Sequence, residues 1–186
     1  MQGKTHELIG IATATTIIVS SDKLGVLPSV CLLAGTVIGS YFPDIDIPTS
    51  AAGDKFFIVT WPFYLFRWLL RLLSKLLKPL KNSAKVLSHR GLFHSVILYG
   101  VLFALFWTFR GNMGQIPTYI LTGFYLGVFS HLFADFFTGG MMIFSPIYNK
   151  KIIPPIRFKS GGMINTICIV ASTLVIAFDI YKYMVY

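Results

Sequence analysis

The amino-acid sequence predicts an all-α polytopic membrane helical bundle of about five transmembrane helices, with one basic amphipathic helix at the membrane interface. Composition is the first indication, because 55% of the 186 residues are hydrophobic and only 12% are charged. A soluble globular domain carries about 25% charged residues. The apolar residues also gather into five runs that approach the roughly 20 residues needed to cross a bilayer. We therefore predict a single integral membrane domain over residues 1–186.

The five predicted spans are separated by polar or basic connections. They are Leu8–Ser20, Leu24–Phe42, Leu92–Phe109, Ile116–Phe137 and Met163–Tyr181. The first is the shortest, and it can cross only if it begins near Thr5 and reaches Ser21. No cleavable signal peptide is expected, because the N-terminal residues lack a strongly basic region and a small-residue cleavage pattern. We expect the first span to stay in the mature protein.

Residues 63–86, between the second and third spans, predict the amphipathic helix. Basic side chains recur there every three or four residues, and leucines and aromatic residues fill much of the rest. The basic residues are Arg67, Arg71, Lys75, Lys78, Lys81 and Lys85. Pro79 should bend or end this helix. Such a helix lies on a membrane with its cations at anionic head groups. The alternative is a helix that packs against the rest of the protein and whose basic residues only keep this segment on the cytoplasmic side.

The distribution of basic residues orients the spans. With five crossings, all of the 16 lysines and arginines except Lys23, Arg110 and Lys182 fall on the side of the N-terminus. The positive-inside rule then places the N-terminus in the cytoplasm and the C-terminus outside. Topology thus explains most of the net charge of +9. No nucleic-acid partner is predicted.

Eight ionisable side chains stand at the cytoplasmic ends of the predicted spans. They are His6, Glu7, Asp44, Asp46, His89, His94, His131 and Asp135. His131 and Asp135 share a helix face inside an apolar run, where an unpaired carboxylate is costly. Each residue alone could be a helix cap, a loop residue or half of a structural hydrogen bond. Their clustering on one side favours a shared site, whereas Asp179 is expected to reach water at the outer end.

A set of imidazoles and carboxylates without a thiolate favours binding of a divalent metal ion. Zinc is the predicted metal, with manganese and iron(II) as alternatives, and the residues could bind one or two ions. The predicted metal ligands are His6, Asp44, Asp46, His89, His94, His131 and Asp135. The choices between Asp44 and Asp46, and between His89 and His94, stay open. A bound ion lowers the pKa of a coordinated water, which predicts hydrolysis.

Arg90, at the start of the third span, is suited to bind an anionic phosphoryl group. The alternative is that Arg90 is only one of the basic residues that keep this end of the span in the cytoplasm. The predicted catalytic residues are Arg90, Asp46 and His94.

Several motifs together resemble one known family. Thr5-His6, Pro43-Asp44-Ile45-Asp46, His89-Arg90-Gly91 with His94-Ser95, and His131-Leu132 with Asp135 look like the motifs of the YdjM-like, LexA-regulated, membrane-bound metal-dependent hydrolases. The resemblance covers about residues 4–140. It implies a metal-dependent hydrolase of the bacterial cytoplasmic (inner) membrane. The order of the motifs is also similar in outline to zinc-dependent phospholipase C.

These observations predict a membrane-bound metal-dependent hydrolase that acts at the cytoplasmic leaflet on a phosphoester of a membrane lipid. The interfacial depth of the polar residues favours a lipid head group over a soluble substrate. The alternatives are a transporter, or a metal-stabilised membrane scaffold, that uses the same histidines and aspartates. The outer halves of the spans are almost wholly apolar, which favours the enzyme. The predicted partners are the lipid substrate and a membrane with anionic lipids, and protein partners are left open.

Overall fold

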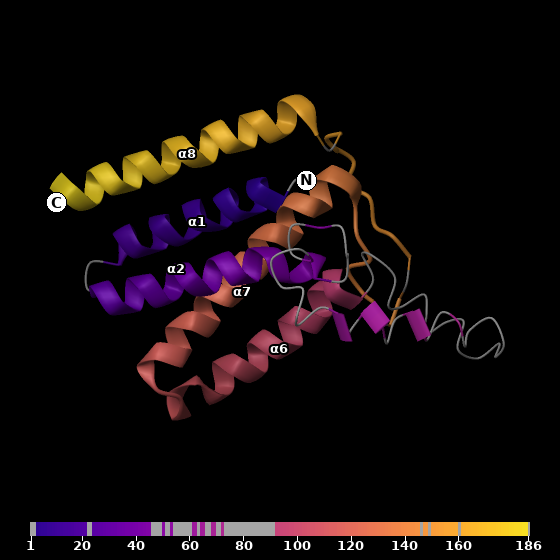
Figure 1. The fold of residues 1–186 in the computed structure, drawn as a ribbon, viewed down its shortest axis with the longest axis horizontal. Coiled ribbons are helices and arrows are strands. Elements are labelled where there is room, and N and C mark those ends of the chain that lie inside the picture. Colours follow the sequence, from indigo (N-terminus) through magenta and orange to yellow (C-terminus); the bar gives the residue numbers. More distant parts are fainter. Residues whose placement is uncertain are drawn as a thin grey trace.

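The computed structural model forms a bundle of long helices (Figure 1). It describes residues 3–21, 24–45, 92–145, 147–148, 150–159 and 161–185, with single residues or pairs between 50 and 72. The helices are α1 (Gly3–Ser20), α2 (Val26–Tyr41), α6 (Val96–Phe109), α7 (Gln115–Gly139) and α8 (Gly162–Val185), and the 3-10 turns are η1 (Phe42–Asp44), η2 (Leu92–His94) and η3 (Arg110–Asn112). The described residues form no strand beyond an isolated bridge between Met141 and Ile152. The predicted all-α fold is confirmed.

Three of the described helices are long and apolar enough to cross a membrane. They are Val26–Asp44, Gln115–Gly139 and Gly162–Val185. They correspond to the second, fourth and fifth predicted spans and support the membrane bundle. The other two predicted spans form α1 and the shorter apolar helix Val96–Asn112, which run alongside these three in Figure 1. Whether these two helices also cross stays a prediction.

The most extensive helix contact joins α2 to α7. Each helix carries two glycines spaced by four residues, Gly35 and Gly39 on α2 and Gly123 and Gly127 on α7. A Cβ built on Gly39 or Gly127 would lie 2.0 or 2.1 Å from a carbonyl oxygen of the facing helix. The two backbones therefore touch, as small residues at this spacing allow between membrane helices. This contact sets the end of α2 beside the C-terminal half of α7.

The last helix, α8, packs on α1, which lies between α8 and α2 (Figure 1). Asp179 of α8 is only 5% exposed. It accepts hydrogen bonds from the hydroxyl groups of Thr15 at 2.8 Å and Thr16 at 2.9 Å. The expectation that Asp179 reaches water was therefore wrong, because α8 turns this carboxylate toward hydroxyl donors on α1. Buried charge is costly unless such partners are present.

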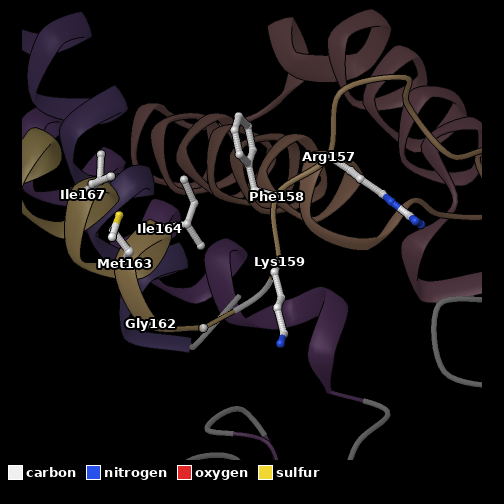
Figure 2. Close-up of a pocket in the computed structure, with 8 residues that line it drawn as sticks. Arg157, Phe158, Lys159, Gly162, Met163, Ile164 and Ile167 are labelled. Atoms are coloured by element: carbon white, nitrogen blue, oxygen red, sulfur yellow. The ribbon is translucent and has the colours of Figure 1, made fainter.

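The chain between α7 and α8 is fixed to the end of α7. Gly140 adopts φ +65°, a conformation that favours glycine, and its N–H donates to the Phe136 carbonyl at 2.9 Å. Farther along, the N–H of Phe158 donates to the Phe137 carbonyl at 2.9 Å. Figure 2 shows Phe158 with its neighbours Arg157 and Lys159. This returning segment therefore lies against the last turn of α7.

The predicted interfacial helix at residues 63–86 falls mainly outside the described residues, and all of its basic residues do. The described residues between 61 and 72 are helical. Among them Trp61 and Trp68 are exposed by 53% and 60%. The contact of this segment with a membrane surface stays a prediction.

Candidate metal centre

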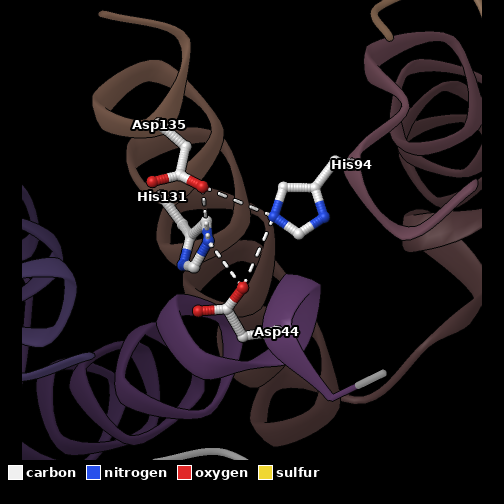
Figure 3. A group of neighbouring side chains, drawn as sticks. All are labelled: Asp44, His94, His131 and Asp135. Carbon is white, nitrogen blue, oxygen red and sulfur yellow. Dashed lines mark ion pairs between the residues drawn. The ribbon is translucent and has the colours of Figure 1, made fainter. Parts of the chain in front are cut away.

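Five of the predicted site residues meet at one end of the bundle. His6 comes from α1, Asp44 from η1, His94 from η2, and His131 and Asp135 from α7. The three histidines and Asp135 are all buried. Figure 3 shows the polar ends of Asp44, His94, His131 and Asp135 turned toward one another. We call these four residues the His/Asp cluster.

The α2–α7 contact positions three members of the cluster. Pro43 lies in the 3-10 turn η1, which continues from α2 and places Asp44 next to α7. His131 and Asp135 follow Gly127 on α7 at four-residue intervals, so all three share one face of that helix. The glycine that lets the backbones touch thus lies on the same face as His131 and Asp135.

A helix cap positions the fourth member, His94. The Ser95 hydroxyl accepts a hydrogen bond from the Leu98 N–H at 3.2 Å and so caps α6. The same hydroxyl donates to the Ser145 carbonyl, which ties the start of α6 to the chain beyond α7. Tyr99, Val128, Leu132 and Met141 form a buried apolar core between these elements. His94 is therefore held by its flanking residue and by the packing of α6 on α7.

The distances within the cluster fit a single metal ion. His94 Nε2 lies 3.5 Å from Asp44 Oδ1 and 3.6 Å from Asp135 Oδ2. His131 Nε2 lies 3.7 Å and 4.0 Å from the same two oxygens. These separations are longer than strong hydrogen bonds but close to the roughly 3.4 Å between ligands that stand about 2.1 Å from a tetrahedral ion. All four atoms lie within 4.8 Å of one another.

The orientation of the His131 ring also suits a metal ligand. Its Nδ1 lies 2.7 Å from the Ser40 carbonyl oxygen, to which it donates, so Nε2 keeps a free lone pair. That Nε2 is buried and has no hydrogen-bond partner among the described residues. A histidine held through one nitrogen by a carbonyl, with the other nitrogen turned to an ion, is the usual arrangement in metal sites.

His6 lies behind the cluster. Its Nε2 is 3.2 Å from Asp135 Oδ1, whereas the other oxygen of Asp135 faces His94. The His6 ring also stacks on His131 with a centroid distance of 3.8 Å. His6 is thus in contact with two members of the cluster but does not belong to the group of four. This geometry fits a residue that orients Asp135.

Three predicted site residues, Asp46, His89 and Arg90, lie outside the described residues. Two contacts near the cluster were not foreseen from the sequence: the Ser40 carbonyl that orients His131, and a hydrogen bond from the Tyr41 hydroxyl to Glu7 that joins α2 to α1. A backbone carbonyl leaves no signal in a sequence. The sequence places Glu7 at the start of the first predicted span, but nothing in the sequence indicates its partner.

Comparison with known proteins agrees with the sequence motifs. The family described as "YdjM inner membrane protein" matches residues 1–185. Inner membrane protein YdjM of Escherichia coli (strain K12) is 28% identical over 174 residues, which cover 89% of this chain and 76% of that protein. The protein of Bacillus subtilis (strain 168) named "Uncharacterized protein YvsG" is 27% identical over 188 residues, with coverage of 100% and 97%. No solved structure matches the chain. The predicted family and inner-membrane location are confirmed, and the orientation of the termini stays a prediction.

Proposed function

The chain belongs to the family of YdjM inner membrane proteins, and on that premise we propose that it is a membrane-bound metal-dependent hydrolase. One observation carries the proposal. Two imidazole nitrogens and two carboxylate oxygens, supplied by η1, η2 and α7, converge at distances that suit one divalent ion. The proposed substrate is a phosphoester of a membrane lipid.

Zinc is the proposed ion, with manganese or iron(II) as alternatives, because neutral imidazole and carboxylate oxygen are ligands that all three accept. When bound, such an ion lowers the pKa of water and stabilises negative charge on a phosphoryl oxygen. His94, His131, Asp44 and Asp135 would hold it. The geometry favours one ion for these four residues, whereas the sequence left one or two open.

The surrounding residues keep the ligands in place. The Ser40 carbonyl fixes the tautomer and direction of His131, and His6 holds one oxygen of Asp135 so that the other faces the centre. Contacts of this kind commonly change metal affinity or activity by about 10- to 100-fold when removed. Arg90 and Asp46 keep, within this proposal, the phosphoryl-binding and catalytic roles that the sequence predicts.

The position of the cluster favours a lipid substrate. Asp44 is the last residue of the membrane span Val26–Asp44, so the cluster lies where that span ends. The Asp44 side chain is 18% exposed, whereas the other three cluster side chains are 4% exposed or less. A lipid head group would therefore approach from the Asp44 side without leaving the interface.

The proposal is tested by hydrolysis in vesicles. Purified protein loaded with zinc should release phosphate or head group from at least one member of a panel of lipid phosphoesters. His131→Ala and Asp135→Asn should abolish this release, whereas Asp179→Asn, a matched change at the opposite end of the bundle, should retain it. A zinc-loaded wild type that cleaves no ester in the panel would overturn the proposed activity.

A second function, transport of an ion, is favoured by one feature of α8. Its buried polar residues Asn165, Ser172 and Asp179 recur every seven residues and thus follow one face of the helix along its length. Polar side chains inside membrane helices also mark transport pathways. Uptake of zinc into proteoliposomes by the wild type, lost in Asp179→Asn, would support this alternative over the hydrolase.

A further inference from the structure

A pocket lies at the start of α8, and none of the four residues of the His/Asp cluster lines it (Figure 2). Its volume is about 670 Å³, within the range of roughly 300–1,000 Å³ that is typical of ligand sites. We call it the basic pocket, because two cations stand beside an apolar wall. The side chains that define it are those of Arg157, Phe158, Lys159, Met163, Ile164 and Ile167.

A backbone hydrogen bond holds the segment that carries the two basic residues of the pocket. The N–H of Phe158, the residue between them, donates to the Phe137 carbonyl of α7 at 2.9 Å. In Figure 2 the Phe158, Arg157 and Lys159 side chains leave the segment in three different directions, and the Arg157 guanidinium points away from Ile164 and Ile167. No carboxylate is among the described residues that line the pocket. Its positive charge is therefore available to an anion.

The apolar wall belongs to a membrane helix. Met163 and Ile167 are 79% and 54% exposed on α8, which is long and apolar enough to cross a bilayer. Side chains exposed on such a helix face lipid chains. The basic pocket thus has two basic residues in its lining next to a helix surface that faces hydrocarbon, which matches a molecule with an anionic head and an apolar tail.

The basic pocket lies at the same end of the bundle as the His/Asp cluster. Phe137, which anchors the cationic segment, follows Asp135 by two residues on α7. α8 also begins beside the N-terminal end of α1, the helix that supplies His6 (Figure 1). A lipid held in the pocket would therefore have its head group at the level of the cluster.

We propose that the basic pocket binds an anionic phospholipid, with its head group at the rim lined by Arg157 and Lys159 and an acyl chain along Ile164 and Ile167, and that this lipid is the substrate class. The claim that this lipid is the substrate class rests on the proposed function, whereas the claim that the pocket binds the lipid does not. The plainer alternative is that both cations only mark the side of the membrane on which the loop stays. Lys150 and Lys151, exposed on the same loop but outside the pocket, provide the matched control.

Binding is measured on the full protein in detergent by native mass spectrometry with dioleoyl-phosphatidylglycerol. Each basic residue near a membrane contributes about 1 kcal/mol toward anionic lipid, or about 5-fold in affinity. We expect Arg157→Gln/Lys159→Gln to weaken binding by about 25-fold and Lys150→Gln/Lys151→Gln to leave it nearly unchanged. Equal losses in the two variants, or no loss in either, would overturn the proposal.

Two further arms identify the ligand and separate the proposals. Glycerol phosphate, which carries the anion without the chains, should not displace the lipid, and displacement would overturn the assignment to a phospholipid. Wild-type binding of phosphatidylglycerol without its hydrolysis would support the pocket while rejecting this lipid as the substrate, and cleavage of no ester in the whole panel would reject the proposed activity. Hydrolysis of phosphatidylglycerol with an unchanged KM in Arg157→Gln/Lys159→Gln would instead overturn the pocket and leave the hydrolase intact.

Discussion

Gly127 links helix packing to the geometry of the His/Asp cluster. A Cβ at this position would lie 2.1 Å from the Thr36 carbonyl oxygen and 2.6 Å from the Ser40 nitrogen. Ordinary contacts of a Cβ begin at 3.4 Å, and both obstructing atoms belong to backbone. Gly127→Ala must therefore move α2 and α7 apart by about 1 Å, because a closely packed interface has no free volume to absorb the methyl group.

This separation acts directly on the geometry of the His/Asp cluster. Asp44 and the Ser40 carbonyl move with α2, whereas His131 and Asp135 move with α7. Distances between a metal and its ligands hold to within about 0.2 Å. After a displacement of about 1 Å, the side chains on α2 and those on α7 could no longer bind the same ion. We expect Gly127→Ala to lose most of its bound metal and about 1–3 kcal/mol of folding free energy.

The assay is metal content per chain by plasma mass spectrometry, together with the melting temperature in detergent. Gly100→Ala in α6 is the matched control, because a Cβ there would meet no atom within 4 Å. Its metal content should equal that of the wild type, and its stability should be unchanged or slightly raised. A Gly127→Ala protein with full metal content and an unchanged melting temperature would refute the link between the helix contact and the site.

Three further predictions concern other parts of the molecule. Asp179→Leu should lower the free energy of unfolding by about 1–3 kcal/mol, because the Thr15 and Thr16 hydroxyls lose their acceptor. Asp179→Asn should lower it by less. If both variants melt in detergent at the same temperature as the wild type, these hydrogen bonds do not stabilise the packing of α1 on α8. His6→Ala should weaken zinc affinity by about 10- to 100-fold without abolishing binding, because His6 orients Asp135, and complete loss in a zinc titration would instead make His6 a ligand. A reporter that is active only in the cytoplasm should work when inserted near Ala52 and fail when fused to the C-terminus, and the reverse pattern would place the cluster on the outer side.

The fold was largely predictable because each membrane span needs a long apolar run. The predicted span Leu24–Phe42 corresponds to α2 with its continuing turn, and Ile116–Phe137 lies within α7. The pairing of α2 with α7 was not predicted. Glycines four residues apart occur on both helices and indicate close packing, but this spacing does not predict which helix is the partner.

The site was predictable in its residue types and in the end of the bundle where they gather. Spacing alone placed His131 and Asp135 on one face of a helix, and the alternation of the five predicted spans placed the other ionisable groups on the same side. The relation of His6 to Asp135 required the structure, because it depends on how α1 lies against α7. The same holds for Asp179, whose burial depends on the rotation of α8 toward Thr15 and Thr16.

The central claim is that Asp44, His94, His131 and Asp135 together hold a divalent ion. The most direct measurement is the number of zinc ions bound per chain in the purified wild type, in Asp135→Asn and in Asp179→Asn. Both variants replace a buried carboxylate of a membrane helix by its amide, but only Asp135 belongs to the cluster. We predict one ion per chain in the wild type and in Asp179→Asn, and its loss in Asp135→Asn. A wild type that binds no zinc, manganese or iron, or an Asp135→Asn protein with full metal content, would contradict the claim.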